Sequence, residues 1–152
     1  MSHTIAAVST GNVISAIGII RLTGDESAAI GGKVFTCISG KPLSEAPTRK
    51  LILGELHDKE GRVIDSCCAI YTRGPHSYTG EDTVEFHCHG SPAVLAAGLE
   101  ALFAAGAVPA KRGEFTKRAM SGVQPALLHY TECPWKCQTF FEQNVCFCNY
   151  FQ

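Results

Sequence analysis

The residues best suited to chemistry recur at every second position of one stretch, from residue 82 to residue 89. They are one carboxylate and two imidazoles, Glu85, His87 and His89. Between them lies an apolar set, Val84, Phe86 and Cys88. Strict alternation is typical of a β-strand, in which every second side chain lies on the same face. The stretch therefore predicts a strand with one face in the core and the other face able to bind a ligand.

The polar face of this strand permits a metal site. Two histidines two positions apart can share a zinc ion when a third ligand is present, and Glu85 lies on the same face. Hydrogen bonding of the histidines within a pocket or turn is the favoured alternative, because no other residue with ligand spacing is nearby in the sequence. An acid–base group of Glu81, Asp82 and Glu85 is also open, although the first two follow a glycine turn and suit turn or capping roles equally well. We assign no catalytic residue and no metal ligand.

Glu85 and Arg21 are charged residues in apolar strand contexts. An unpaired carboxylate between core residues is expensive, and a partner with adjacent N–H donors would satisfy it in bidentate fashion. Arg21 lies in the apolar run AIGIIRL, which predicts a central strand covered on both faces. The sequence supports two roles for Arg21 equally: a strand-end side chain reaching water, or a contact to an anionic group of a ligand.

The elements around these residues predict an α+β fold with a small mixed or antiparallel sheet of five or six strands and two or three helices. Predicted strands cover residues 4–9, 16–22, 50–57, 62–72, 82–89 and 107–110, and predicted helices cover 25–35, 92–105 and a start at 114–119. Asp25 is the expected cap of the first helix. Ser91 and Pro92 suit the N-cap and first position of the second, and Gly106 suits its end.

Composition places few constraints on function. The chain has 152 residues and a net charge of −1, which gives no basic surface for phosphate backbones or anionic lipid. Because no signal peptide and no apolar run of membrane-spanning length is visible, we expect a cytoplasmic protein without membrane contact. No G-x-x-x-x-G-K-[ST] sequence is present, so we expect neither a GTP site nor the accompanying potassium site.

The composition changes at about Ser121. The remaining segment holds seven of the thirteen aromatic residues and four of the eight cysteines, Cys133, Cys137, Cys146 and Cys148. Their spacing departs from zinc-binding cysteine pairs, so a disordered or loosely docked tail is favoured over an ordered zinc site. We therefore divide the chain into a domain of residues 1–120 and an atypical tail of residues 121–152.

Three motifs in the first part, AIGIIRLTG, PHSYTGEDTVEFHCHGSPAV and RGEFTKRA, resemble the N-terminal domain of the MnmE (TrmE) family of tRNA-modification GTPases. The resemblance covers roughly residues 4–120. It implies a fold similar to the folate-binding domain of aminomethyltransferases, binding of 5-formyltetrahydrofolate, and a homodimer. Full-length members work with the flavin-dependent partner MnmG (GidA) to modify C5 of the wobble uridine of tRNA. Partner and tRNA are doubtful for the present fragment.

Carried over to this sequence, the folate contacts fall on Arg21 and Glu85, and Glu85 would pair with the amino and N3–H edge of the pterin. A third family contact, a lysine, has Val123 or Gln124 in its place. The family sequence also continues into a helical domain and a GTPase domain, neither of which is recognisable after Ser121. We interpret the tail as the product of truncation or a frameshift, and expect folate binding and dimerisation without GTPase activity. The alternatives are a small zinc-binding module that uses the tail cysteines, and a non-functional fragment.

Overall fold

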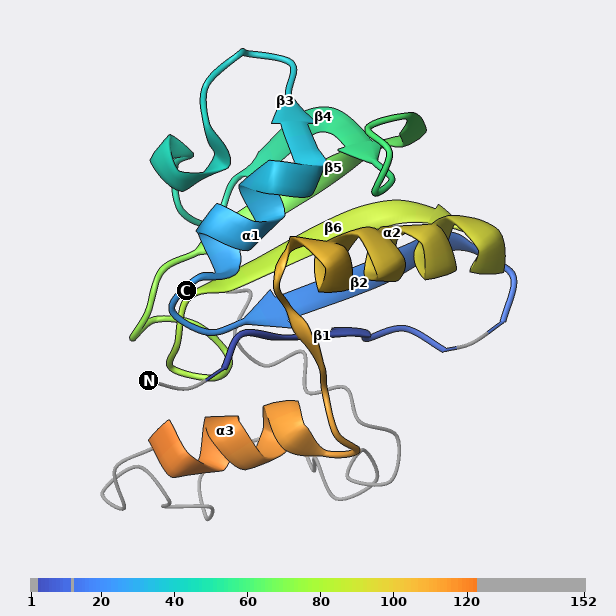
Figure 1. The fold of residues 1–152 in the computed structure, drawn as a ribbon. Helices are drawn as coiled ribbons and strands as arrows, with labels where there is room; N and C mark the ends of the chain where they lie inside the picture. The colour runs from blue at the N-terminus through green and yellow to red at the C-terminus, as the bar shows by residue number, and fades with distance from the viewer. Residues whose placement is uncertain (1–2, 12, 123–152) are drawn as a thin grey trace.

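The computed structural model describes residues 3–11 and 13–122. These residues form one seven-stranded sheet with three α-helices and one short 3₁₀ helix (Figure 1). The strands are β1 (Ile5–Val8), β2 (Ser15–Thr23), β3 (Phe35–Cys37), β4 (Leu51–His57), β5 (Val63–Thr72), β6 (Thr83–Gly90) and β7 (Val108–Pro109). The helices are α1 (Ser27–Val34), η1 (Leu43–Glu45), α2 (Pro92–Ala105) and α3 (Glu114–Gly122).

The sheet has the order β3-β4-β5-β6-β2-β1-β7. Every neighbouring pair is antiparallel except β1 and β7, which are parallel. The central pair, β2 and β6, comes from distant parts of the chain, and its register places Arg21 opposite Glu85. Because side chains alternate between faces, this register also places both charged residues on the same face of the sheet.

The core lies between the sheet and the helices α1 and α2, which Figure 1 shows together on one face. Phe86 and Ile20 are completely buried there, as is Leu102 of α2. Glycines let α2 lie close to the sheet: a Cβ atom at Gly98 would lie 2.7 Å from Cδ1 of Ile20, and one at Gly18 would lie 2.7 Å from Cδ1 of Leu95. The opposite face carries Glu85 and Arg21, and we call it the open face.

The α+β fold is confirmed, with three corrections to its elements. The sheet has seven strands because Phe35–Cys37, too short to give an alternation signal, pairs with β4. Helix α1 begins at Ser27 with Glu26 at its N-cap, so Asp25 is not the cap. Strand β2 is not covered on both faces, since Ile17 on the open face is 57% exposed.

The second helix begins where its sequence predicts, although Ser91 at the N-cap makes no side-chain capping bond. Gly106 ends it with a φ of 120°, which favours glycine. Among the described residues no helix is both long and apolar enough to cross a membrane. The predicted tail lies outside the described residues, apart from Ser121 and Gly122.

Candidate functional site: a charged pair on the open face of the sheet

Arg21 and Glu85 form an ion pair at the centre of the sheet. Nε of Arg21 donates a hydrogen bond to Oε1 of Glu85 at 2.7 Å. The two side chains are 24% and 10% exposed. The sequence indicated that each charge needs a partner, and the structure shows that each is a partner of the other. The pair is thus oriented by two neighbouring strands, which are rigid supports for a binding site.

The environment of Glu85 favours its ionised form. Burial by itself raises the pKa of this carboxyl, but the hydrogen bond and charge of His87, together with Arg21, outweigh burial and hold the pKa at about 2. Nε2 of His87 lies 3.5 Å from Oε2, on the side away from Arg21. Glu85 is therefore an acceptor of hydrogen bonds at neutral pH.

Two aromatic rings flank the guanidinium group of Arg21. Its Cζ atom lies 5.3 Å from the ring centre of Tyr78 and 5.8 Å from that of Phe115. Tyr78 belongs to the loop before β6 and Phe115 belongs to α3, so these two segments meet over Arg21. Contacts of this kind attract a cation to the ring face and limit its movement.

A cluster of threonine hydroxyls holds the loop before β6 against the sheet. Thr79 bonds to Thr23 and Thr83, whose hydroxyls also bond to each other at 3.2 Å. Thr23 lies two residues beyond Arg21 on β2, and Thr83 lies two residues before Glu85 on β6. The cluster therefore fixes the loop beside the charged pair.

The carboxylates before β6 have structural partners. Asp82 accepts hydrogen bonds from the hydroxyl of Tyr71 and from the backbone N–H of Gly74, the latter at 2.9 Å. Glu81 pairs with Arg118 of α3 at 2.8 Å. These contacts give Asp82 a turn role and use Glu81 to attach α3, so the acid–base interpretation gains no support from them.

The two histidines of β6 lie beside different carboxylates. His87 lies beside Glu85, whereas Nδ1 of His89 is 2.7 Å from Oδ1 of Asp65. The backbone N–H of His89 also donates to Oδ2 of Asp65 at 2.8 Å. His89 is thus hydrogen-bonded to Asp65, and the two imidazoles do not share one carboxylate.

A pocket of about 670 Å³ lies between the loop before β6 and α3. Its lining includes Thr79 and Glu81 from the loop, and Lys117 and Arg118 from the helix. Its size is within the usual range for small-molecule sites. Thr79 is shared with the threonine cluster, whereas Arg21 and Glu85 are not among the residues that line the pocket.

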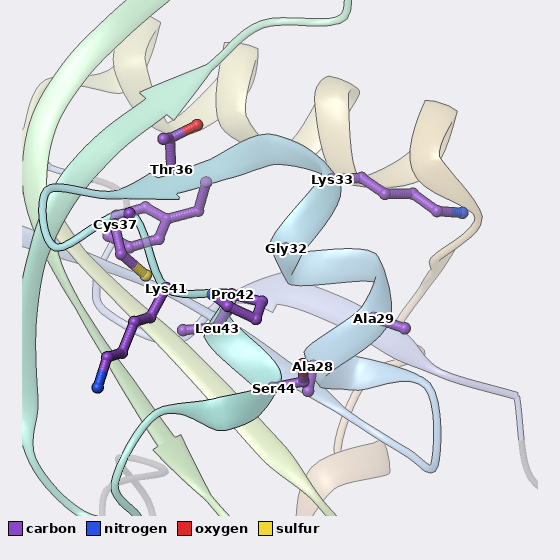
Figure 2. Close-up of a pocket in the computed structure, with 12 residues that line it drawn as sticks. Ala28, Ala29, Gly32, Lys33, Thr36, Cys37, Lys41, Pro42, Leu43 and Ser44 are labelled. Carbon is purple, nitrogen blue, oxygen red and sulfur yellow. The ribbon is translucent and has the colours of Figure 1, made fainter.

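A second pocket of about 420 Å³ is unrelated to the charged pair. Figure 2 shows it between α1 and residues 41–44, with the Cys37 sulfur and Leu43 at its wall. The amino group of Lys33 points away from it, and donates to the carbonyl of Ala105 at 3.1 Å. No pair of complementary charges lines it, so we place the candidate site on the open face.

Sequence reasoning found Arg21 and Glu85 but missed three residues around the β6 histidines and the charged pair: Tyr78, Phe115 and Asp65. Phe115 and Asp65 reach their partners only through folding of a distant segment, and neither stands out by its neighbours in the sequence. Tyr78 offered the nearest signal, because an aromatic residue in a glycine-bounded loop close to a pocket strand is a candidate for covering it.

The fold and the charged pair define this chain as a small α+β domain with a polar site on the uncovered face of its sheet. The family model described as "GTP-binding protein TrmE N-terminus" matches residues 4–122. The chain belongs to this family. The match includes the whole described sheet together with Arg21 and Glu85.

Curated relatives agree with this assignment. Proteins named tRNA modification GTPase MnmE are 44% identical over 123 residues in Leptospira interrogans, 40% over 119 residues in Clostridioides difficile and 46% over 120 residues in Thermus thermophilus. Each alignment covers 78% of this chain, and 26%, 26% and 27% of the respective relative. The chain thus spans about a quarter of the length of the relatives it matches.

Proposed function

We propose that this domain binds 5-formyltetrahydrofolate through Arg21 and Glu85. The observation that carries the proposal is the ion pair between these residues on the open face of the sheet. An ionised carboxylate that accepts hydrogen bonds is complementary to the adjacent amino and N3–H donors of a pterin. The pKa of about 2 supports this role, because Glu85 needs no deprotonation before it binds.

In this proposal Arg21 keeps Glu85 ionised and presents its guanidinium group to the ligand. Tyr78 and Phe115 are then the flat surfaces nearest to the ligand, since they flank Arg21. A conjugated ring can contact such surfaces in an offset-stacked or edge-to-face arrangement. The preformed pair and the fixed loop reduce the entropy lost when the folate binds.

The wider function that we propose is a one-carbon step in tRNA modification at C5 of the wobble uridine. The names of the relatives support tRNA modification as the process. We propose further that the domain forms a homodimer and takes part in the process together with a GTPase domain and a flavin-dependent MnmG partner. Apolar side chains on the open face, among them Leu51 and Leu53, support association of two copies.

Thermal unfolding tests folate binding directly. We expect 5-formyltetrahydrofolate to raise the melting temperature of the purified chain, because a ligand that binds only the folded state stabilises it. The variant Glu85→Ala should lose this rise. Glu55→Ala, which removes an exposed carboxylate from β4, is the matched control and should keep it. An unchanged melting curve of the unmutated chain at saturating folate would refute the proposal.

A further inference from the structure

Three side chains of types that bind metals meet near the start of β5 and the end of β6, away from the charged pair. They are Asp65, Cys67 and Cys88, and their nearest ligand atoms all lie within 4.8 Å of one another. Both cysteines belong to the core cluster and are at most 4% exposed, while Asp65 is 9% exposed. A carboxylate and two thiols in so small a volume are a ligand set for a thiophilic ion.

The register of the sheet brings the two thiols together. Cys68 lies opposite His87, so the same antiparallel register places Cys67 opposite Cys88. The alternation of each strand turns both side chains towards the helices and away from the open face. The sequence alone placed Cys88 in the apolar set of its strand, and its pairing with Cys67 appears only when the strands are aligned.

His89 holds Asp65 in place from the surface side. His89 donates its backbone N–H to Oδ2 at 2.8 Å and places Nδ1 2.7 Å from Oδ1. Hydrogen bonds of this kind orient the carboxylate ligands of metal sites. The side chain of His89 is 75% exposed, so Asp65 connects the buried thiols to the protein surface.

We propose that Cys67, Cys88 and Asp65 bind one zinc ion, with His89 as the residue that orients Asp65. Two thiolates on a tetrahedral zinc ion lie about 3.8 Å apart at a Zn–S distance of about 2.3 Å, which the observed spacing allows. The three side chains supply three of the usual four ligands. Each thiol gives its proton to solvent as the ion binds, so each ion releases two protons.

Without a metal ion, the surroundings of Cys67 favour its neutral form. The hydrogen bond from Cys88, burial and the charge of Asp65 raise the pKa of the Cys67 thiol. The Cys67 thiol is therefore uncharged in the absence of a metal ion. A divalent cation reverses this preference, because its charge stabilises the thiolates more than burial opposes them.

The test uses the full chain with Cys133, Cys137, Cys146 and Cys148 replaced by serine, so that the tail contributes no thiolate. Titration with Co²⁺ reports thiolate ligation through the sulfur-to-cobalt charge-transfer absorption. We expect saturation at one ion per chain, competition by Zn²⁺, and release of two protons per ion. Proton release is measured with Asp65, Cys67 and Cys88 unsubstituted. It therefore tests the proposal even if variants at these positions unfold.

The variants then identify the ligands. Cys67→Ser and Cys88→Ser should each abolish the absorption, and Asp65→Asn should weaken Co²⁺ binding by at least about tenfold. Cys68→Ser, one residue away but on the open face, is the matched control and should bind as before. Absence of the absorption with excess Co²⁺ would overturn the proposal. So would absorption that persists in a folded Cys67→Ser, Cys88→Ser double variant, or a Cys67–Cys88 disulfide that withstands reduction.

Discussion

At the scale of single residues, the burial of Glu85 beside Arg21 makes stability depend on pH. The folded-state pKa of Glu85 is about 2, against an ordinary value of 4.5. The unfolded state therefore binds more protons than the folded state at acidic pH. The stabilisation from this group is complete above about pH 4.5 and is lost as the pH falls towards 2.

We predict that lowering the pH from about 6 to about 3 removes roughly 2 kcal/mol of the free energy of unfolding through this one group. In Glu85→Gln this part of the pH dependence should be absent. Urea denaturation at the two pH values measures the difference. The control Glu55→Gln should retain the dependence of the unmutated chain, and equal pH dependence in all three proteins would contradict the assigned pKa.

The residue scale also shows what could be anticipated without coordinates. Arg21 and Glu85 were found because a charge in an apolar strand needs a partner, and this cost depends only on local sequence. That they pair with each other depends on the register of β2 with β6. Asp65 and Phe115 could not be found in this way, because strand alignment and the position of α3 bring them to their partners.

At the scale of elements, the contact between β3 and β4 depends on the absence of a side chain at Gly54. A Cβ atom there would lie 2.3 Å from Cζ of Phe35 and 2.5 Å from the carbonyl oxygen of Thr36. Phe35 cannot move freely, because it also packs on Phe86 with ring centres 5.3 Å apart. The edge of the sheet is thus built around one glycine.

We predict that Gly54→Ala lowers the free energy of unfolding by about 1–3 kcal/mol, as overpacking of a core does. Gly32→Ala is the contrasting change. It lies on an exposed position of α1 where the new Cβ would meet only Cβ of Leu43, at 3.9 Å. It should raise the free energy of unfolding by about 0.5–1 kcal/mol, because alanine favours a helix. Chemical denaturation measures the free energy of unfolding of both variants. An unchanged value in Gly54→Ala would contradict the packing described.

Elements with a strong local signal were predicted well, and short ones were not. The alternation in β6 and the Ser-Pro start and glycine end of α2 fix those elements locally. Strand β3 has three residues and exists only because β4 is beside it. The exposed start of β2 was missed because an apolar run indicates burial, whereas Ile17 lies on the uncovered face.

At the scale of the whole molecule, the open face carries more exposed apolar side chains than a solvated sheet face requires. Leu51 is 64% exposed, Leu53 is 52% exposed and Ile17 is 57% exposed. The register places β4, β5, β6 and β2 side by side, so these side chains lie on one continuous surface with the charged pair. A second copy covering this face would also cover the proposed folate site.

We predict that the unmutated chain is a dimer by size-exclusion chromatography with light scattering, and that Leu53→Lys shifts it towards monomer. A lysine buried in the contact would lose its hydration without a partner. The control is Val63→Lys, at the start of β5, where the valine is 53% exposed and beside the hairpin turn. A monomeric unmutated chain, or equal dimerisation of both variants, would contradict an interface on this face.

The pairing of β2 with β6 also determines when the site can form during folding. Arg21 and Glu85 are 64 residues apart in sequence, and α1, β3, β4 and β5 lie between their strands along the chain. Contacts of such long range form slowly and late, because the loop must close before the contact stabilises it. Glu85 lies in the β3–β4–β5–β6 part of the sheet, and Arg21 lies in the β2–β1–β7 part. We therefore expect a folate-binding signal during refolding to rise with the last, global phase. Folate binding would then report the time at which the sheet is complete.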